Sequence, residues 1–348
     1  MFAADSNVAP APPKDNSAPV ISWKQIIGPV EPFLEAVSLR LGAQVEAFDP
    51  AITPYADYAL NGQGKQLRPA LVALTANAFG KPSDAHITIA VIIEMVHLAT
   101  LVHDDVMDEA EIRRRKLTIA ANWGNDIAVL FGDCLFANAL RLAASFPTPE
   151  VCRAVASATN TVCSGEIIQN QHKRDFSFTR ERYFKVLEMK TAELFALSCE
   201  LSAFLSTANP ERRQSLREFG LAFGTAYQLY DDCVDLFGSE ESAGKSLGSD
   251  LAQGKLTLPM LLLWERANAT DRHRVQAVVQ SWQPESVKSI VELLAKYDTL
   301  SGSLEIFETY LQRARASLED LPHSTGRSNL AGLTEYLARQ TRALEVVA

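Results

Sequence analysis

Two copies of one acidic pattern hold the side chains in this chain that are best suited to chemistry. Each copy has two adjacent aspartates and a third three positions later, and in a helix this spacing places three carboxylates on neighbouring parts of one surface. Clustered carboxylates repel one another, and Mg²⁺ prefers carboxylates combined with water and substrate phosphates. We therefore predict two facing Mg²⁺-binding walls around a phosphorylated ligand. The predicted metal ligands are Asp104, Asp105, Asp108, Asp231, Asp232 and Asp235.

Basic residues lie on both sides of the first copy. Lys65 and Arg68 follow Gly64 at a spacing that lets both charges approach one anion near a helix start. Taken alone, such a pair is more often a solvated helix end. Arg113 and Arg114 begin a four-residue basic run after the first copy, and guanidinium groups bind phosphate oxygens as forks. An exposed loop with salt bridges is the alternative for that run.

Other polar residues accompany the second copy. Gln228 precedes it by about one turn, and a glycine-rich segment after it carries Lys245 and Lys255. Lysines on such a segment suit closure over a phosphate. Lys190 and Thr191 follow an apolar and aromatic run between the two copies, where a single helical lysine is usually a surface residue unless its context indicates otherwise.

The elements that position these residues are predicted to be helices. From Trp23 onward apolar residues recur at spacings of three and four, and the alternation typical of strands is scarce. We predict an all-α bundle of about ten or more helices, with 87–100 deep inside it because this run is apolar nearly all round. Breaks are predicted at 61–64, 81–84, 146–149, 209–210, 238–248 and 283–284.

Composition limits the class of protein further. A disordered Ala/Pro-rich leader is predicted at 1–22, followed by one catalytic domain at 23–348, because no Pro/Gly/Ser-rich linker divides the rest. The net charge of −9 argues against a nucleic-acid partner. The cysteines show no CxxC spacing and indicate buried thiols in a reducing compartment, so a cytoplasmic protein is predicted. Apolar runs such as 258–264 are too short to cross a bilayer, so no integral membrane segment is predicted.

An ordered set of motifs resembles that of the trans-isoprenyl diphosphate synthases, also called the polyprenyl synthetase family. The resemblance covers roughly Trp23 to the C-terminus. One DDxxD motif is a weak signal in an acidic chain, but eight motifs in the right order are specific. The motifs are Gly64-Lys-x-x-Arg-Pro69, His97, Asp104-Asp-x-x-Asp108, Arg113-Arg114, Gly165-Glu166-x-x-Gln169, Lys190-Thr191, Gln228-x-x-Asp231-Asp-x-x-Asp235 and Gly254-Lys-x-Thr-Leu-Pro259.

The resemblance implies helices around a deep central cavity, usually in a homodimer. It implies that the six aspartates bind Mg²⁺ ions that bridge an allylic diphosphate. Further positive charge on that diphosphate would come from Arg113, Lys190, Lys245 and Lys255. Isopentenyl diphosphate would be held alongside by Lys65, Arg68, His97 and Arg114.

The resemblance also implies a reaction. The allylic C–O bond ionises, and the alkene of isopentenyl diphosphate attacks the resulting carbocation in a 1′-4, head-to-tail condensation. Lys190, Thr191 and Gln228 are the predicted catalytic residues, the last two acting as oxygen dipoles near the cation. Water must be excluded because it would convert the cation to an alcohol.

Product length is predicted from residues one helical turn before Asp104. Short-chain members of the family commonly place Phe or Tyr near this level, whereas this chain has Ala99 and Thr100. Small residues leave the cavity open, so we predict an all-trans product of twenty carbons or more. Deeper layers near 137–140 and 158–162 would then set the end of extension. Close helix packing is the alternative reason for small residues here.

One segment departs from the family pattern. Arg115 and Leu117 stand where the family usually has Gly and Pro, which leaves the loop geometry open. The alternatives to a long-chain synthase are a farnesyl or geranylgeranyl diphosphate synthase, a terpene cyclase, a non-catalytic partner subunit or a diphosphate hydrolase. Lys65, Arg68 and His97 argue against a cyclase, which needs no isopentenyl diphosphate site. Two complete acidic motifs argue against a non-catalytic subunit.

Overall fold

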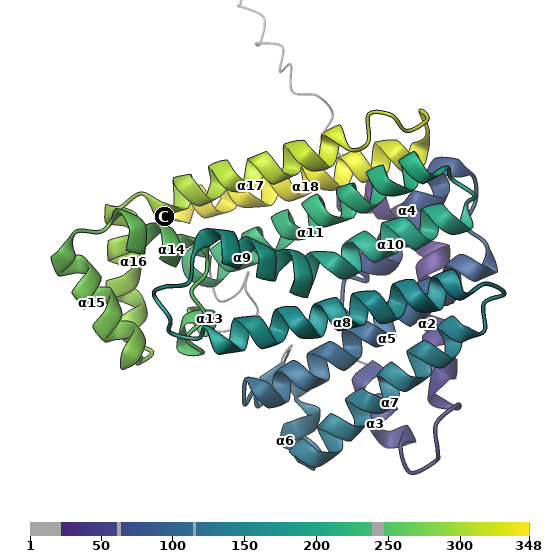
Figure 1. Ribbon diagram of the computed structural model, residues 1–348, viewed down its shortest axis with the longest axis horizontal. Helices are drawn as coiled ribbons and strands as arrows, with labels where there is room; N and C mark the ends of the chain where they lie inside the picture. Colours follow the sequence, from purple (N-terminus) through teal and green to yellow (C-terminus); the bar gives the residue numbers. More distant parts are fainter. Residues whose placement is uncertain (1–21, 61–63, 114–115, 239–246, 348) are drawn as a thin grey trace, which may run out of the picture.

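Nearly all of the described chain is helical. The computed structural model describes residues 22–60, 64–113, 116–238 and 247–347, and in these ranges the long helices lie side by side in one bundle (Figure 1). This confirms the predicted all-α class, with more than ten helices. Two predicted site residues, Arg114 and Lys245, lie outside the described residues, as does the leader up to residue 21.

The elements of the first half surround one long central helix, α5. They are α1 (Trp23–Ile27), the 3₁₀ turn η1 (Gly28–Val30), α2 (Glu31–Val45), α3 (Thr53–Leu60), α4 (Leu67–Phe79), α5 (Asp84–Met107), β1 (Ile112–Arg113), β2 (Lys116–Leu117), α6 (Ile119–Trp123), α7 (Asn125–Ala144) and α8 (Pro149–Gln171).

The second half contains a second long helix, α11, and a group of shorter helices, α14 to α16, at one end of the bundle (Figure 1). Its elements are α9 (Arg180–Leu187), the π-helical turn η2 (Glu188–Ala192), α10 (Glu193–Leu205), α11 (Pro210–Phe237), α13 (Ser249–Ala252), α14 (Leu258–Arg266), α15 (Ala269–Gln280), α16 (Ser286–Lys296), α17 (Thr299–Ala316) and α18 (Thr325–Val347).

Three long helices begin at predicted breaks. Ser83 precedes α5, where its backbone N–H donates to His86 Nδ1 at 3.0 Å in a capping box. Pro149 opens α8, and its fixed φ suits a first helical turn. Asn209 caps α11 by accepting a hydrogen bond from the Arg212 N–H at 3.0 Å. Local sequence therefore decides where the chain enters these helices.

Helix α5 carries the first acidic motif on a buried support. It packs against α2, α4, α7 and α10, and residues 89–93 have no exposed surface. This confirms the prediction that the apolar run lies deep inside the bundle. Because the body of α5 is fixed on several sides, the aspartates at its C-terminal end have a rigid base.

The second motif lies on α11, which approaches α10 and η2 very closely. A Cβ atom on Gly220 would lie 2.5 Å from Ala196 Cα, and one on Gly224 would lie 2.7 Å from Ala192 Cα. Only glycine permits such backbone proximity. At the same four-residue steps this face of α11 continues to Gln228, which therefore faces the π-helical turn.

The segment where Gly and Pro are replaced forms part of a short antiparallel ladder. Ile112 pairs with Leu117 and Arg113 pairs with Lys116. The two residues between the strands, including Arg115, lie outside the described residues. The loop whose geometry the sequence left open is thus bounded by a hairpin ladder.

Two helices, α5 and α7, are long and apolar enough to cross a membrane by length and composition alone. Of the relevant 18-residue windows, 56% of the residues in α5 and 39% in α7 are buried inside the protein. The apolar runs considered in the sequence, such as 258–264, are shorter than α5 and α7, and neither of these two helices was recognised there as long enough to cross a membrane. A core helix of a soluble protein passes the same test, so the absence of a membrane segment stays a prediction.

Candidate active site

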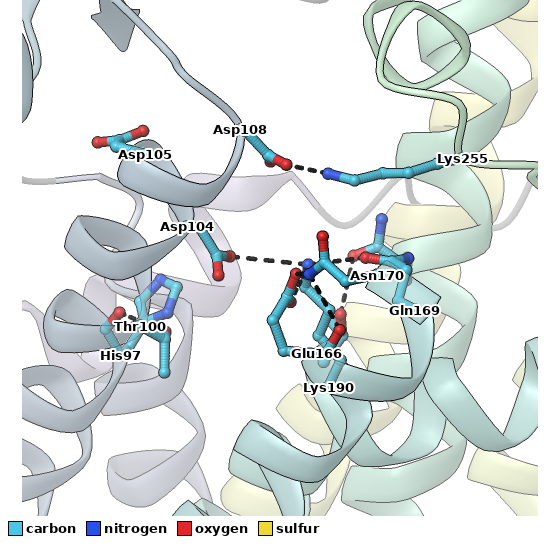
Figure 2. Close-up of polar contacts among 12 residues, drawn as sticks. His97, Thr100, Asp104, Asp105, Asp108, Glu166, Gln169, Asn170, Lys190 and Lys255 are labelled. Atoms are coloured by element: carbon cyan, nitrogen blue, oxygen red, sulfur yellow. Dashed lines mark hydrogen bonds and ion pairs between the residues drawn. The ribbon is translucent and has the colours of Figure 1, made fainter. Parts of the chain in front are cut away.

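The first acidic motif lies at the C-terminal end of α5, where Asp108 is the cap residue. The negative end of the helix dipole disfavours carboxylates at this position. Three of them therefore need nearby positive charge. Figure 2 shows Asp104 and Asp108 pointing toward Lys190 and Lys255, whereas Asp105 points to the other side of the helix.

Asp105 and Asp108 are already paired with basic side chains. Asp105 Oδ1 accepts a hydrogen bond from Arg113 Nε at 2.7 Å. Asp108 contacts two lysines: Oδ2 lies 2.8 Å from Lys255 Nζ, and Oδ1 lies 3.4 Å from Lys173 Nζ. These pairs bring the predicted Arg113 and Lys255 to the first motif and add Lys173, which the sequence argument did not single out.

Asp104 faces a buried network around Lys190 (Figure 2). Lys190 Nζ lies 3.7 Å from Asp104 Oδ2, donates to Gln169 Oε1 at 2.9 Å and forms a close ion pair with Glu166 Oε2. The other Glu166 oxygen accepts from Asn170 Nδ2 at 2.9 Å. Lys190 is thus an interior lysine held by carboxylates, not the surface lysine that its isolated sequence position suggests.

Lys190 and Thr191 lie in the π-helical turn η2, between α9 and α10. Such turns are rare and frequently occur at functional sites. Helix α8 passes very close to this turn: a Cβ on Gly165 would lie 2.9 Å from the Lys190 backbone nitrogen. The extra residue in the turn and the close approach of α8 together direct both side chains into the site.

A second hydrogen-bonded chain runs from η2 to the second acidic motif. Thr191 Oγ1 donates to Gln228 Oε1 at 3.0 Å, and Gln228 Nε2 donates to Asp232 Oδ1 at 2.8 Å. The buried Tyr183 hydroxyl donates to Asp232 Oδ2. Burial raises the pKa of Tyr183 well above its usual range, so the hydroxyl keeps the proton that it donates. The structure thus joins both predicted cation-stabilising residues to Asp232.

Asp235, the last aspartate of the second motif, caps the short helix α13. Its side chain is fully buried. Oδ1 accepts from the Ser249 hydroxyl at 2.7 Å and from the Ser249 N–H at 3.2 Å, and Oδ2 accepts from the Asp250 N–H at 3.1 Å. These bonds satisfy the first N–H groups of α13. A metal at Asp235 would have to share these oxygens with the helix cap, and the role of Asp235 as a metal ligand stays a prediction.

A cavity lies beside both motifs. It contains Asp232 from the second motif, and its lysines contact Asp104 and Asp108 of the first. The lining therefore combines carboxylates, ammonium groups, polar oxygens and apolar side chains in one space. Its residues are Gln169, His172, Phe178, Tyr183, Leu187, Lys190, Thr191, Gln228, Asp232, Asp250, Lys255, Leu256 and Thr257.

The residues predicted for isopentenyl diphosphate lie around α4 and α5. Lys65 is exposed and lines a second cavity, which Tyr227 also lines. The Arg68 guanidinium carbon lies 4.7 Å from the Phe195 ring centroid, a cation–π contact. His97 lies on α5 below Asp104 in Figure 2. No ligand contact tests their role, which stays a prediction.

The chain-length residues lie one turn below the first motif. Ala99 is fully buried, and Thr100 is partly exposed. Thr100 Oγ1 donates to the His97 carbonyl at 2.7 Å, so its hydroxyl is satisfied by its own helix. The Thr100 methyl is then the part left to face its surroundings.

Electrostatics distinguish the aspartates of the first motif. Burial raises the pKa of Asp104 to about 6; Lys190 opposes this effect, and Glu166 reinforces it. Burial also disfavours the charged form of Asp108, but Lys255, together with Lys173 and Lys190, more than offsets burial and holds the pKa below its usual range. Burial raises the pKa of Asp105 in spite of the Arg113 ion pair. Additional positive charge would therefore be accepted most readily near Asp104.

The donor set fits Mg²⁺ in its chemistry. Among the residues that the structure describes, no three His, Cys, Asp or Glu side chains already converge on one metal position. Asp104 and Asp108 nevertheless point the same way and offer hard oxygen ligands, and Asp231 of the second motif is partly exposed. These three would hold Mg²⁺, with diphosphate oxygens and water completing its coordination.

Known proteins with this arrangement identify the family. The sequence model of the family described as Polyprenyl synthetase matches residues 49–296. The chain belongs to this family. It is 34% identical over 308 residues to the heptaprenyl diphosphate synthase component 2 of Bacillus subtilis (strain 168), covering 88% of each chain. It is 33% identical over 286 residues to the octaprenyl diphosphate synthase of Escherichia coli (strain K12), covering 82% of this chain and 88% of the relative.

Solved structures of polyprenyl synthases share the fold. The structure of a polyprenyl synthase from Caulobacter crescentus CB15, complexed with calcium and isoprenyl diphosphate, matches with a TM-score of 0.86 and 30% identity. The match covers 92% of this chain and 99% of that one. A divalent cation and a prenyl diphosphate are therefore bound by a protein of the same fold.

Sequence reasoning missed several residues of this polyprenyl synthetase site. Lys173 belongs to no recognised spacing, although it comes shortly after the Gly165 motif at the end of α8. Tyr183 was noted only as the start of an aromatic run. Glu166 belonged to a quoted motif but was given no role. The role of each residue can be recognised only when its partner in the fold is known.

Proposed function

We propose that this chain is a Mg²⁺-dependent trans-prenyltransferase. It would condense an allylic diphosphate with isopentenyl diphosphate, 1′-4 and head to tail, to give an all-trans polyprenyl diphosphate. The observation that supports this most is the pairing of Asp104 and Asp108 with Lys190 and Lys255, two lysines that line one cavity. Carboxylates for a metal and lysines for a diphosphate lie within reach of each other, as ionising a diphosphate ester requires.

The lysines and carboxylates have separate tasks in this proposal. Bound Mg²⁺ would supply positive charge to the departing diphosphate. Asp104, Asp108 and Asp231 would hold the ion, and their present lysine partners would turn to the diphosphate oxygens. Lys190 and Lys255 thus bind the leaving group as its charge develops.

Thr191 and Gln228 would act on the carbon skeleton. Their side-chain oxygens lie 3.0 Å apart on the cavity wall, and both present partial negative charge without a strong nucleophile. An allylic cation in front of them is stabilised but not captured. The apolar residues Phe178, Leu187 and Leu256 of the same lining limit the water that could quench it.

Isopentenyl diphosphate would bind at Lys65, Arg68, His97 and Arg114, with its alkene toward the cavity. Positioning two substrates side by side converts the bond-forming step into an effectively intramolecular one. The proton lost at the end would go to the departed diphosphate. Lys245 would add positive charge to the allylic diphosphate.

The proposed product has twenty carbons or more. The small residues Ala99 and Thr100 support this, as do the heptaprenyl and octaprenyl synthases among the relatives. A farnesyl diphosphate synthase, whose product has fifteen carbons, is the alternative, and a geranylgeranyl product with twenty carbons is the lower limit of the proposal. Product length on this enzyme is measured directly, because each cycle adds five carbons.

We further propose a cytoplasmic homodimer that associates through α6 and α7. Apolar side chains gather there on the surface: Leu130 is 61% exposed, Val129 41% and Trp123 37%. Patches of this kind mark association surfaces. The name "component 2" of the Bacillus subtilis relative indicates the competing possibility, a complex with a different subunit. The mass of the purified chain in solution, and its fall on Leu130→Asp, test the homodimer.

The function is tested by turnover. Purified protein is incubated with labelled isopentenyl diphosphate and an allylic primer of ten, fifteen or twenty carbons, with Mg²⁺ or with a chelator. We expect incorporation with Mg²⁺ only and products of at least twenty carbons. A primer converted to a cyclic hydrocarbon would indicate a terpene cyclase. No incorporation with any primer would reject the proposal for the chain alone.

A further inference from the structure

Tyr183 lines the active-site cavity, but it has no role in the reaction as proposed above. It lies on α9, is 3% exposed and donates its hydroxyl hydrogen to Asp232 Oδ2. The second oxygen of Asp232 accepts from Gln228 Nε2 at 2.8 Å. Gln228 Oε1 in turn accepts from Thr191 Oγ1 at 3.0 Å. Four side chains from three elements therefore form one continuous hydrogen-bonded chain.

The direction of the Gln228 amide matters for the chemistry. An amide oxygen and an amide nitrogen are similar in size, but a half-turn of the group exchanges a hydrogen-bond acceptor for a donor. Only the oxygen end presents negative charge to an allylic cation. An acceptor placed at the nitrogen and a donor placed at the oxygen select one orientation. Asp232 is that acceptor, and Thr191 is that donor.

Asp232 can do this only if its own carboxyl group is fixed. A carboxyl group has two oxygens, and each can take either position as the group rotates. Tyr183 occupies Oδ2 and so leaves Oδ1 to accept from Gln228. The arrangement holds whether Asp232 is ionised or carries a proton on Oδ2, because Oδ1 remains an acceptor in both cases.

The packing leaves this chain little freedom. The close approach of α11 to η2, where a Cβ on Gly224 would lie 2.7 Å from Ala192 Cα, fixes Gln228 one turn further along. The Tyr183 ring packs against the Phe184 ring, with the two ring centroids 5.3 Å apart. A small change at the tyrosine hydroxyl is therefore transmitted to Gln228 through Asp232 and not absorbed by backbone movement.

We infer that Tyr183 is a positioning residue that fixes the Gln228 amide, through Asp232, with its oxygen toward the allylic cation. The inference rests on the proposed prenyl transfer. It also gives Asp232 a role other than metal binding, since both of its oxygens are engaged by donors from the protein.

Tyr183→Phe tests this because it removes one oxygen and keeps the ring. We expect kcat to fall about tenfold, while KM for both diphosphates changes less than about twofold. The share of allylic substrate released as alcohol should rise, since a less stabilised cation is open to water. Tyr310→Phe is the matched control: Tyr310 is also largely buried, and its ring centroid is 5.6 Å from the Phe184 ring. It should leave kcat unchanged.

A double variant separates positioning from general packing. In an Asp232→Ala background, Tyr183→Phe should cause little further loss, because both changes act on the same chain of bonds. Fully additive losses, or an unchanged kcat in Tyr183→Phe alone, would overturn the inference. Failure of the proposed function appears separately, as absence of turnover in the unaltered protein.

A spectroscopic measurement needs no turnover. The Gln228 side-chain amide, labelled with ¹⁵N and assigned by its loss in Gln228→Leu, should exchange its protons slowly in the unaltered protein. Its resonance should shift and its exchange should accelerate in Tyr183→Phe but not in Tyr310→Phe. An amide signal that is the same in all three proteins would contradict the inference.

Discussion

Asp108 and Lys255 are 147 positions apart in the chain, yet Asp108 Oδ2 lies 2.8 Å from Lys255 Nζ. The lysine is held in place by the segment before it, where its backbone N–H donates to the Asp250 carbonyl at 2.9 Å. Asp235 caps the start of that segment. One aspartate of the second motif thus fixes the loop whose lysine meets the first motif.

Removing the Lys255 charge should weaken binding of the allylic diphosphate. Lys255→Ala is expected to raise KM for the allylic substrate by about tenfold or more, since a largely buried charged partner is lost. KM for isopentenyl diphosphate should change much less. Lys185→Ala, on the exposed face of α9, is the control. Equal KM values in both variants would show that Lys255 does not contact the leaving group.

Substitutions of Asp231 and Asp235, the first and last aspartates of the second motif, should affect different properties of the protein. Asp235→Ala is expected to lower the free energy of unfolding by about 1–3 kcal/mol, because buried N–H groups lose their acceptor. Asp231→Ala should leave stability nearly unchanged but weaken Mg²⁺ binding. Chemical denaturation and calorimetric titration measure the two quantities. The reverse pattern would indicate that Asp235 is a metal ligand.

Mg²⁺ binding should depend on pH through Asp104. Its pKa in the fold is about 6, compared with an ordinary value of 3.8. Metal binding requires the ionised carboxylate, so the apparent Kd should rise as pH falls through 6, approaching tenfold per unit from this group. Titration of metal at pH 5, 6 and 7 measures this. A pH-independent affinity would contradict it.

As pH falls, Asp104 should increase the stability of the metal-free protein, whereas it should decrease the affinity for Mg²⁺. Between pH 3.8 and 6 the folded state binds more protons at Asp104 than the unfolded chain does, so this group stabilises the fold as pH falls. Asp104→Asn removes that dependence. The difference in unfolding free energy between the two proteins should therefore shift in favour of the unaltered protein from pH 7 to pH 4. No shift would indicate an ordinary pKa.

The close packing of α8 against the π-helical turn should be important for both stability and kcat. Gly165→Ala places a methyl group 2.9 Å from the Lys190 nitrogen, so the π-helical turn must move. We expect a loss of about 1–3 kcal/mol in stability and a lower kcat. Gly42→Ala, where nothing lies within 4 Å of the new methyl, should be neutral or stabilising. Similar thermal unfolding of both variants would contradict this.

Product length should respond to a ring below the first motif. Thr100→Phe is expected to shorten the main product by at least one five-carbon unit, since the ring narrows the space one turn below Asp104. Thr309→Phe is a control, because Thr309 also donates to a carbonyl of its own helix but is exposed on the surface of α17. Chromatography of the dephosphorylated products gives the length. An unchanged distribution would place the limit elsewhere.

The fold class and much of the charged constellation were predictable from the sequence. Periodicity indicated helices, and the end of α5 places Asp104 and Asp108 on one side because their four-residue spacing matches the helical repeat, whereas Asp105 points to the other side. Lys190 was predicted through its motif, but its surroundings were not. A π-helical turn has no distinct apolar period, and the ion pair with Glu166 joins two helices that sequence spacing cannot relate.

Asp235 shows that equal spacing in a repeated motif does not give equal surroundings. Its spacing within the second copy equals that of Asp108 within the first, so the sequence predicts equal roles. Asp108 ends its helix and faces the lysines, whereas Asp235 is followed by two further residues of α11 and meets the returning chain. Which side chain faces the cavity is thus decided by packing that is distant in sequence.

The most direct measurement is a crystal structure of the protein with Mn²⁺ and a non-ionising thio analogue of the allylic diphosphate. We expect anomalous peaks beside Asp104, Asp108 and Asp231, with Lys190 and Lys255 turned from their carboxylates to diphosphate oxygens. A bound diphosphate with no metal at these carboxylates, or with Lys255 still paired to Asp108, would contradict the proposed division between metal ligands and diphosphate ligands.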